Sequence, residues 1–209
     1  MTLAPPLTQP PPGLEPLELP WALRLTPEQF ELVCQANPDA VLELAADGQL
    51  IAMTPTGSET GARSGEIFFQ LKRFARAFGG YQAFDSSTGF RLPDGSVLSP
   101  DASLVRLERW LALTPEQRRG FAPLCPDLVV ELASPGDEGP RGVSALHQKM
   151  EAYRANGAQL GWLLLPDEQT VEIWRVDRSE PERVEQASQL GGGLMFPGLV
   201  IDLAEIWVV

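Results

Sequence analysis

The apolar runs of this 209-residue chain are short, and this limits its fold more than any other feature. The longest are strand-sized pieces such as LGWLLL at 160–165. They alternate with segments in which apolar residues recur every three or four positions, the spacing of an amphipathic helix. Interleaved strands and helices predict an α/β fold with a mixed central sheet flanked by helices. No run approaches the roughly 20 apolar residues that span a bilayer, so we expect a soluble, cytoplasmic protein without a membrane partner.

The same patterns give approximate element boundaries. An Asp47-Gly48 turn between two alternating halves predicts a β-hairpin at about 41–53. We expect a single domain over 21–209 and a disordered, proline-rich tail over 1–20, which lacks the basic and apolar regions of a signal peptide. Helices are expected at about 26–37, 61–78 and 144–158, with another short helix capped by the TPEQ at 114–117. Strands are expected at 81–84, 88–92, 96–105, 127–133, 160–165 and 171–176.

Charge is distributed unevenly along the chain. The net charge is −12, yet residues 61–120 hold nine Lys and Arg against six Asp and Glu. This basic middle third is compatible with a nucleic-acid contact on an otherwise acidic surface, although a solvated helix face would give the same pattern. The basic residues of the long helix, which we take as candidate phosphate contacts, are Arg63, Lys72, Arg73 and Arg76.

One carboxylate interrupts an apolar strand. In residues 127–133, Val129, Glu131 and Ala133 point to one face of the strand, so Glu131 shares that face with apolar neighbours. A buried carboxylate needs a partner, because burying it unpaired is costly. Asp127 has the same parity but lies about 13 Å away along a straight strand.

Asp101 and Lys149 are better partners for Glu131. Asp101 interrupts another strand-like segment, and adjacent strands lie only about 4.8 Å apart. Lys149 falls among the apolar positions Leu146, Met150 and Tyr153 of the helix at 144–158, and therefore points inward or along the edge of that face. Two carboxylates that hold a divalent cation and a lysine that orients water suit metal-assisted hydrolysis of a phosphodiester.

These segments resemble a known family. STGFRLPDGSVLSPDASLV at 87–105, FAPLCPDLVVELASPGD at 121–137, a lysine in the next helix and LGWLLLPDEQTVEIWR at 160–175 are similar to the Uma-two family over about residues 24–207. That family, common in bacterial genomes, belongs to the PD-(D/E)XK superfamily of restriction-endonuclease-like nucleases. The superfamily motif has a lysine two residues after the acidic residue. Here that position is Ala133, so Lys149 must reach in from the helix.

The resemblance implies a function and a site. It implies a DNA endonuclease that depends on Mg²⁺, with Mn²⁺ as a possible substitute, and related nucleases often act as homodimers. Asp101 and Glu131 would be the metal ligands, Lys149 the catalytic lysine, and Glu66 the helical glutamate that many superfamily members add.

Two alternatives to a nuclease remain open from the sequence. A protein could keep the nuclease fold without catalysis, as a nucleic-acid-binding or protein-interaction module. A carboxylate pair could also serve another hydrolase such as a glycosidase, although the lysine and the family pattern count against this.

Overall fold

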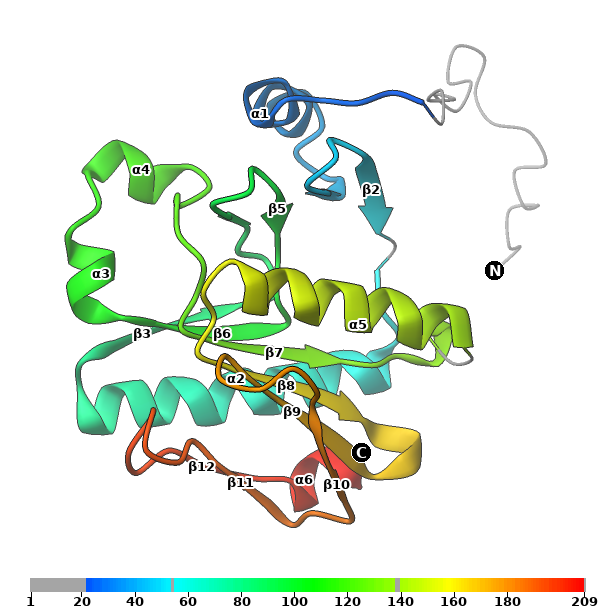
Figure 1. Ribbon diagram of the computed structural model, residues 1–209, viewed down its shortest axis with the longest axis vertical. Coiled ribbons are helices and arrows are strands. Elements are labelled where there is room, and N and C mark those ends of the chain that lie inside the picture. Colours follow the sequence, from blue (N-terminus) through cyan, green and yellow to red (C-terminus); the bar gives the residue numbers. More distant parts are fainter. Residues whose placement is uncertain (1–21, 54, 138–139, 209) are drawn as a thin grey trace, which may run out of the picture.

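The computed structural model describes residues 22–53, 55–137 and 140–208, and the expected tail at 1–20 lies outside them. Within these residues, a mixed sheet of six strands lies between two long helices (Figure 1). The order is β10-β9-β8-β7-β6-β3, and β7 and β8 are parallel while the other neighbours are antiparallel. The strands are β3 (Tyr81–Asp85), β6 (Ala102–Arg106), β7 (Leu128–Leu132), β8 (Leu160–Leu165), β9 (Thr170–Arg175) and β10 (Glu182–Glu185).

The two long helices cover opposite faces of this sheet. Helix α2 (Ser58–Phe78) packs Ile67, Leu71 and Phe74 onto one face and ends at Gly79, whose φ of 68° favours glycine. Helix α5 (Pro140–Ala155) packs Met150 and Tyr153 onto the other. Gly161 of β8 permits this close approach, because a Cβ there would lie 2.4 Å from Cε of Met150.

Smaller elements surround this core. A second sheet has the order β2-β1-β5-β4, and β11 pairs with β12 beside α2. None of the helices in the described part of the chain is long and apolar enough to cross a membrane. The smaller elements are α1 (Pro27–Ala36), β1 (Val41–Leu44), β2 (Leu50–Met53), β4 (Phe90–Arg91), β5 (Val97–Leu98), α3 (Leu107–Leu111), α4 (Pro115–Arg119), the 3₁₀ turns Pro135–Asp137 and Pro166–Glu168, β11 (Gln189–Gly191), β12 (Val200–Asp202) and α6 (Ala204–Trp207).

The hairpin of β1 and β2 has two different faces. Leu42, Leu44 and Leu50 form one face and belong to a cluster that includes Phe30 of α1. Helix α1 begins with a capping box in which Thr26 accepts from the Gln29 backbone N–H. The opposite face of the hairpin is therefore free to border the cavity described below.

Several of the expected boundaries are wrong: the helix expected at 144–158 spans Pro140–Ala155, and two other differences affect the site. The single strand expected at 96–105 is two strands in different sheets, β5 and β6, because the chain breaks at Pro100, which has no N–H for a ladder. Helix α2 also begins at Ser58 rather than near residue 61, so part of the expected loop is helical. The break at Pro100 leaves Asp101 just before β6, and the earlier start of α2 places Thr60 within that helix.

Candidate active site

Strands β6 and β7 bring two carboxylates together. Ala102 lies opposite Val130 in this antiparallel pair, so Asp101 and Glu131 are neighbours one step further along. Oδ2 of Asp101 accepts a hydrogen bond of 2.8 Å from the backbone N–H of Leu132. Within the described part of the chain, no hydrogen bond uses its Oδ1. The structure thus brings together the two carboxylates that the sequence singled out.

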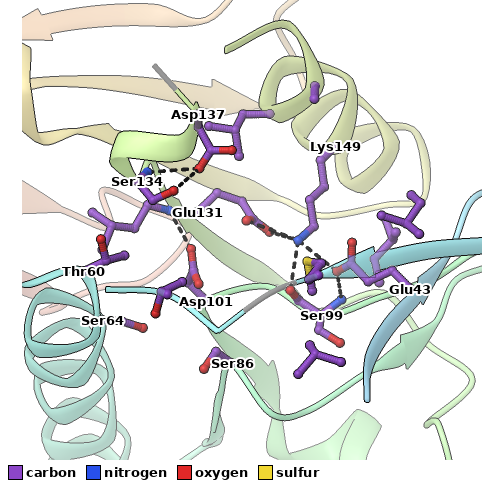
Figure 2. A pocket seen from close by; sticks show the side chains of 18 of the residues that line it. Glu43, Thr60, Ser64, Ser86, Ser99, Asp101, Glu131, Ser134, Asp137 and Lys149 are labelled. Atoms are coloured by element: carbon purple, nitrogen blue, oxygen red, sulfur yellow. Dashed lines mark hydrogen bonds and ion pairs between the residues drawn. The ribbon is translucent and has the colours of Figure 1, made fainter. Parts of the chain in front are cut away.

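Lys149 reaches this pair from helix α5. Its Nζ lies 3.0 Å from Oε1 of Glu131, 2.9 Å from Oε1 of Glu43, and donates to the backbone carbonyl of Ser99 at 3.0 Å (Figure 2). Its side chain is only 15% exposed. The inward orientation that the helical spacing predicted is therefore observed, and the lysine joins three separate segments of the chain.

Glu43 is a site residue that the sequence reasoning missed. It lies on β1, is 3% exposed, and its Oε1 also accepts a 2.7 Å hydrogen bond from the backbone N–H of Ser99. The signal was present in the sequence, because Glu43 shares one face of the hairpin with the apolar residues Val41, Ile51 and Met53. Glu131 has the same unusual placement, a carboxylate among apolar residues on one face of a strand.

Burial controls the protonation of the cluster. It raises the pKa of Glu131 from 4.5 to about 8; Lys149 opposes this shift, and the charges of Asp101 and Glu43 add to it. Burial also raises the pKa of Asp101. For Lys149, burial alone would lower the pKa, but Glu131 and Glu43 outweigh it and raise the pKa above its usual value.

Tyr153 completes the contacts of Glu131. Its hydroxyl donates to Oε1 of Glu131 at 3.1 Å, and its ring is fully buried one turn after Lys149 on α5. Burial and the adjacent Glu131 raise the pKa of this phenol well above 10. Tyr153 therefore stays a hydrogen-bond donor that fixes the orientation of Glu131.

The cluster lies on the wall of a cavity of about 950 Å³. The N-terminal half of α2, helix α5, the β1–β2 hairpin and the turn after β7 line this cavity. In that turn, Ser134 donates its N–H and Oγ–H to Oδ2 of Asp137, at 3.0 and 2.6 Å. Among the described lining residues, five acids face one base; the acids are Glu43, Asp85, Asp101, Glu131 and Asp137, and the base is Lys149.

This donor set fits a hard divalent cation. The acidic excess is a charge that such a cation would offset, and carboxylate oxygens are its preferred protein ligands. Among the described residues, no three Asp, Glu, His or Cys side chains converge into a complete metal cage. Mg²⁺ usually takes one or two carboxylates, with water and substrate phosphate as its other ligands. Asp101 and Glu131 together match that smaller requirement.

Two residues expected at the site lie elsewhere. Glu66 is not among the described residues that line the cavity; its Oε1 accepts from Nε2 of Gln70 at 3.0 Å, on the side of α2 that faces β12. Arg63 is 7% exposed, its Nε donates to the carbonyl of Ile206 at 2.9 Å, and its guanidinium pairs with Glu59 at 2.6 Å. Arg63 therefore holds α6 against α2 and does not face solvent.

The other three basic residues of α2 lie together on its outer surface. Lys72, Arg73 and Arg76 border a shallow depression with Phe69, and the guanidinium of Arg73 lies 5.7 Å from the centroid of the Phe69 ring. Arg73 and Arg76 are exposed and Lys72 is half-buried. This depression is separate from the carboxylate cavity, and its residues are free to contact a ligand.

The fold and the carboxylate–lysine cluster together define a class, the restriction-endonuclease-like proteins. A crystal structure from Anabaena variabilis, described as that of a putative nuclease, is similar to this chain, with a TM-score of 0.69. The two are 20% identical, and the match covers 88% of this chain and 97% of the other. At that identity the likeness shows the fold. The model of the Uma2 family, described as "Putative restriction endonuclease", matches residues 27–204, and this chain belongs to that family. A comparison with curated proteins found no match.

Proposed function

We propose that this protein is a Mg²⁺-dependent endonuclease that hydrolyses phosphodiester bonds of DNA. One observation carries the proposal: Asp101, Glu131 and Lys149 meet at one cavity wall, although they come from two strands and a helix. A structural ion pair needs one acid and one base, whereas this cluster contains an excess of acids. Membership of a family described as a restriction endonuclease supports the same conclusion.

Asp101 and Glu131 are the residues that would hold the metal. Oδ1 of Asp101 makes no hydrogen bond within the described residues, and Tyr153 fixes Glu131 in position. When bound, a divalent cation supplies a Lewis acid for a phosphoryl oxygen and lowers the pKa of a coordinated water. Mn²⁺, which also accepts oxygen ligands, is the expected substitute for Mg²⁺.

Lys149 is the residue that would act on the substrate. Glu131 and Glu43 keep it charged, so it can stabilise the charge that develops on the phosphate, or orient the attacking water. In the hydrolysis, the water oxygen bonds to phosphorus and loses its proton to solvent. One phosphorus–oxygen ester bond breaks, and the departing oxygen takes up a proton to become a hydroxyl. Glu43 and the Ser99 carbonyl hold Lys149 in place for this step.

The basic side chains of α2 would contact phosphates outside the cavity. Lys72, Arg73 and Arg76 suit this role, whereas Arg63 does not because it is buried. Three contacts give a weak and salt-sensitive attraction, since each neutralised phosphate releases counterions. We expect each removal to weaken binding of all sequences alike.

A nicking assay tests the proposed function. Supercoiled DNA is incubated with wild type, Asp101→Asn and Lys149→Met in Mg²⁺ or Mn²⁺, and the nicked and linear products are measured. Wild type should nick only with a divalent cation, and both variants should lose at least about 100-fold in rate. Asp127→Asn, which removes a buried carboxylate from the other end of β7, is the matched control and should retain activity.

The same assay separates the alternatives. A wild type that binds DNA but cuts nothing in either metal contradicts catalysis and favours the non-catalytic module. Activity that survives chelation of divalent cations contradicts the proposed metal dependence. The homodimer inferred from related nucleases stays a prediction, which sedimentation of the purified chain checks.

A further inference from the structure

One wall of the cavity is bare helix backbone. Gly61 and Gly65, one turn apart on α2, both line the cavity, and a Cβ added at either would meet nothing within 4 Å. A glycine inside a helix destabilises it relative to alanine. The packing of the described residues does not require these two glycines, and they leave the helix backbone open to close approach by a ligand.

A hydroxyl without a hydrogen bond among the described residues lies beside the glycines and points the same way. Thr60 is 4% exposed and lines the cavity, yet its hydroxyl makes no hydrogen bond to any residue that the structure describes. Ser64 lies one turn further on, and Figure 2 shows both on the side of the cavity that also holds Asp101. The hydroxyl oxygen itself is not completely buried, so it is accessible from the cavity and can donate to a polar ligand atom at this wall.

The hairpin supplies an apolar wall. Val41 and Ile51 are 46% and 38% exposed, and with Met53 they line the cavity on the same hairpin face as Glu43. The other hairpin face already packs on α1. Apolar side chains that face an open cavity suit the flat face of a nucleobase.

The depth of the site limits what can reach it. Glu43 and Glu131 are each 3% exposed, and the cavity volume of about 950 Å³ lies at the upper end of the range of about 300–1,000 Å³ for pockets that enclose a small molecule. Asp101 is half-buried and Glu131 is almost fully buried, so a phosphate has to enter the cavity to contact both carboxylates. A strand whose bases are unpaired can bend into the cavity.

We propose that the cavity binds one unpaired nucleic-acid strand, with its sugar–phosphate backbone against Gly61 and Gly65 and a base against Val41 and Ile51. The proposal rests on the nuclease function above and names its substrate class. Thr60 would donate to a phosphate or sugar oxygen of that strand. Lys72 and Arg76 follow the glycines and Phe68 on the same side of α2, because positions 61, 65, 68, 72 and 76 have helical spacing. These two basic residues would therefore hold the strand where it leaves the cavity.

The first experiment compares substrates of one sequence. A labelled oligonucleotide is offered to wild type in Mg²⁺ as a single strand, as a blunt duplex, and as a duplex with a central unpaired bubble. The single strand and the bubble should be cut at least ten-fold more efficiently than the blunt duplex, and the bubble within its unpaired region. A blunt duplex that is cut as well as the single strand overturns the proposal.

The second experiment uses the glycine wall. Gly65→Ala should raise the melting temperature, because alanine is the better helix former, and yet weaken binding of the single strand. Gly65→Leu should raise KM for the single strand at least ten-fold with a smaller change in kcat. Ala62→Leu places the same side chain at an exposed position outside the cavity lining and should leave KM unchanged. An unchanged KM in Gly65→Leu contradicts the proposal.

Fluorescence anisotropy in Ca²⁺ distinguishes failure of this inference from failure of the nuclease. If wild type binds the single strand in preference to the duplex, and Gly65→Leu abolishes this preference, the strand pocket is supported even where nothing is cut. If wild type cuts but binds both forms equally, the nuclease stands and the unpaired-strand pocket is overturned.

Discussion

The two ends of strand β7 carry buried carboxylates in opposite electrostatic situations. Asp127 lies just before β7 and Glu131 within it, and both are 3% exposed. Oδ1 of Asp127 pairs with Arg109 at 2.9 Å, and its Oδ2 accepts the backbone N–H of Arg106 at 2.8 Å. Glu131 instead shares Lys149 with Glu43.

The difference is in the balance of charge. Asp127 is locally neutralised because it pairs with Arg109. That arginine is partly exposed and lies away from the acidic cavity. The cluster of Glu131 holds more acids than bases and borders a cavity that can admit a cation. Burial of a carboxylate therefore does not by itself indicate a functional site. Burial together with uncompensated negative charge beside a cavity does indicate one.

The largest expected effect follows removal of the shared lysine. Lys149→Met leaves two buried carboxylates without their cation and should lower the free energy of unfolding by about 3–5 kcal/mol, as breaking a buried pair does. Urea unfolding at pH 8 measures this change. If the stability of Lys149→Met equals that of wild type, Lys149 does not neutralise the cluster.

Asp127→Asn should have a smaller effect on stability and none on catalysis. It weakens charged hydrogen bonds to Arg106 and Arg109 and should lower the free energy of unfolding by about 2 kcal/mol. Nicking per folded molecule should stay within two-fold of wild type. A folded Asp127→Asn without activity would show that the two ends of β7 are not functionally distinct.

The pH dependence of stability sharpens the contrast. The pKa of Glu131 is raised from 4.5 to about 8, so in the metal-free protein the folded state keeps a proton that the unfolded state loses. This contribution to stability is complete below pH 4.5 and is lost as the pH rises towards 8. Unfolding free energies measured in chelator between pH 5 and 9 should fall with a smaller slope in Glu131→Gln than in wild type. Parallel profiles for the two proteins would contradict this assignment.

The smallest effect is expected at Glu66. Its contact is a hydrogen bond from Gln70 on the side of α2 away from the cavity lining. Glu66→Gln should change the free energy of unfolding by less than about 0.5 kcal/mol and leave nicking unaltered. A strong loss of nicking in Glu66→Gln would contradict this and show that Glu66 takes part in the site.

Local pattern predicts one part of this molecule well. The face of Glu131 follows from strand alternation, and the inward position of Lys149 follows from helical spacing. The capping box of α1 and the hairpin at Asp47-Gly48 are likewise encoded within a few residues. Each of these features depends on neighbours in the sequence, so a single sequence suffices to predict it.

The rest depends on contacts between distant segments. Which glutamate joins Lys149 is decided by the position of the hairpin over the central sheet, and spacing alone does not give that position. The same is true of Arg63 and Glu66, because the C-terminal segment binds Arg63 directly and binds Gln70, which in turn donates to Glu66. Glu43 was detectable as an apolar-face carboxylate, but only its partner shows its role.

Calorimetric titration of divalent cations is the most direct test of the central claim, that the acidic excess around Glu131 is a metal site. Mg²⁺ and Mn²⁺ are titrated into wild type, Asp101→Ala and Asp127→Asn at pH 8. We expect saturable binding to wild type and Asp127→Asn, and none to Asp101→Ala with its fold intact by circular dichroism. Absence of binding to wild type at millimolar concentration, or equal binding to Asp101→Ala, would contradict the account.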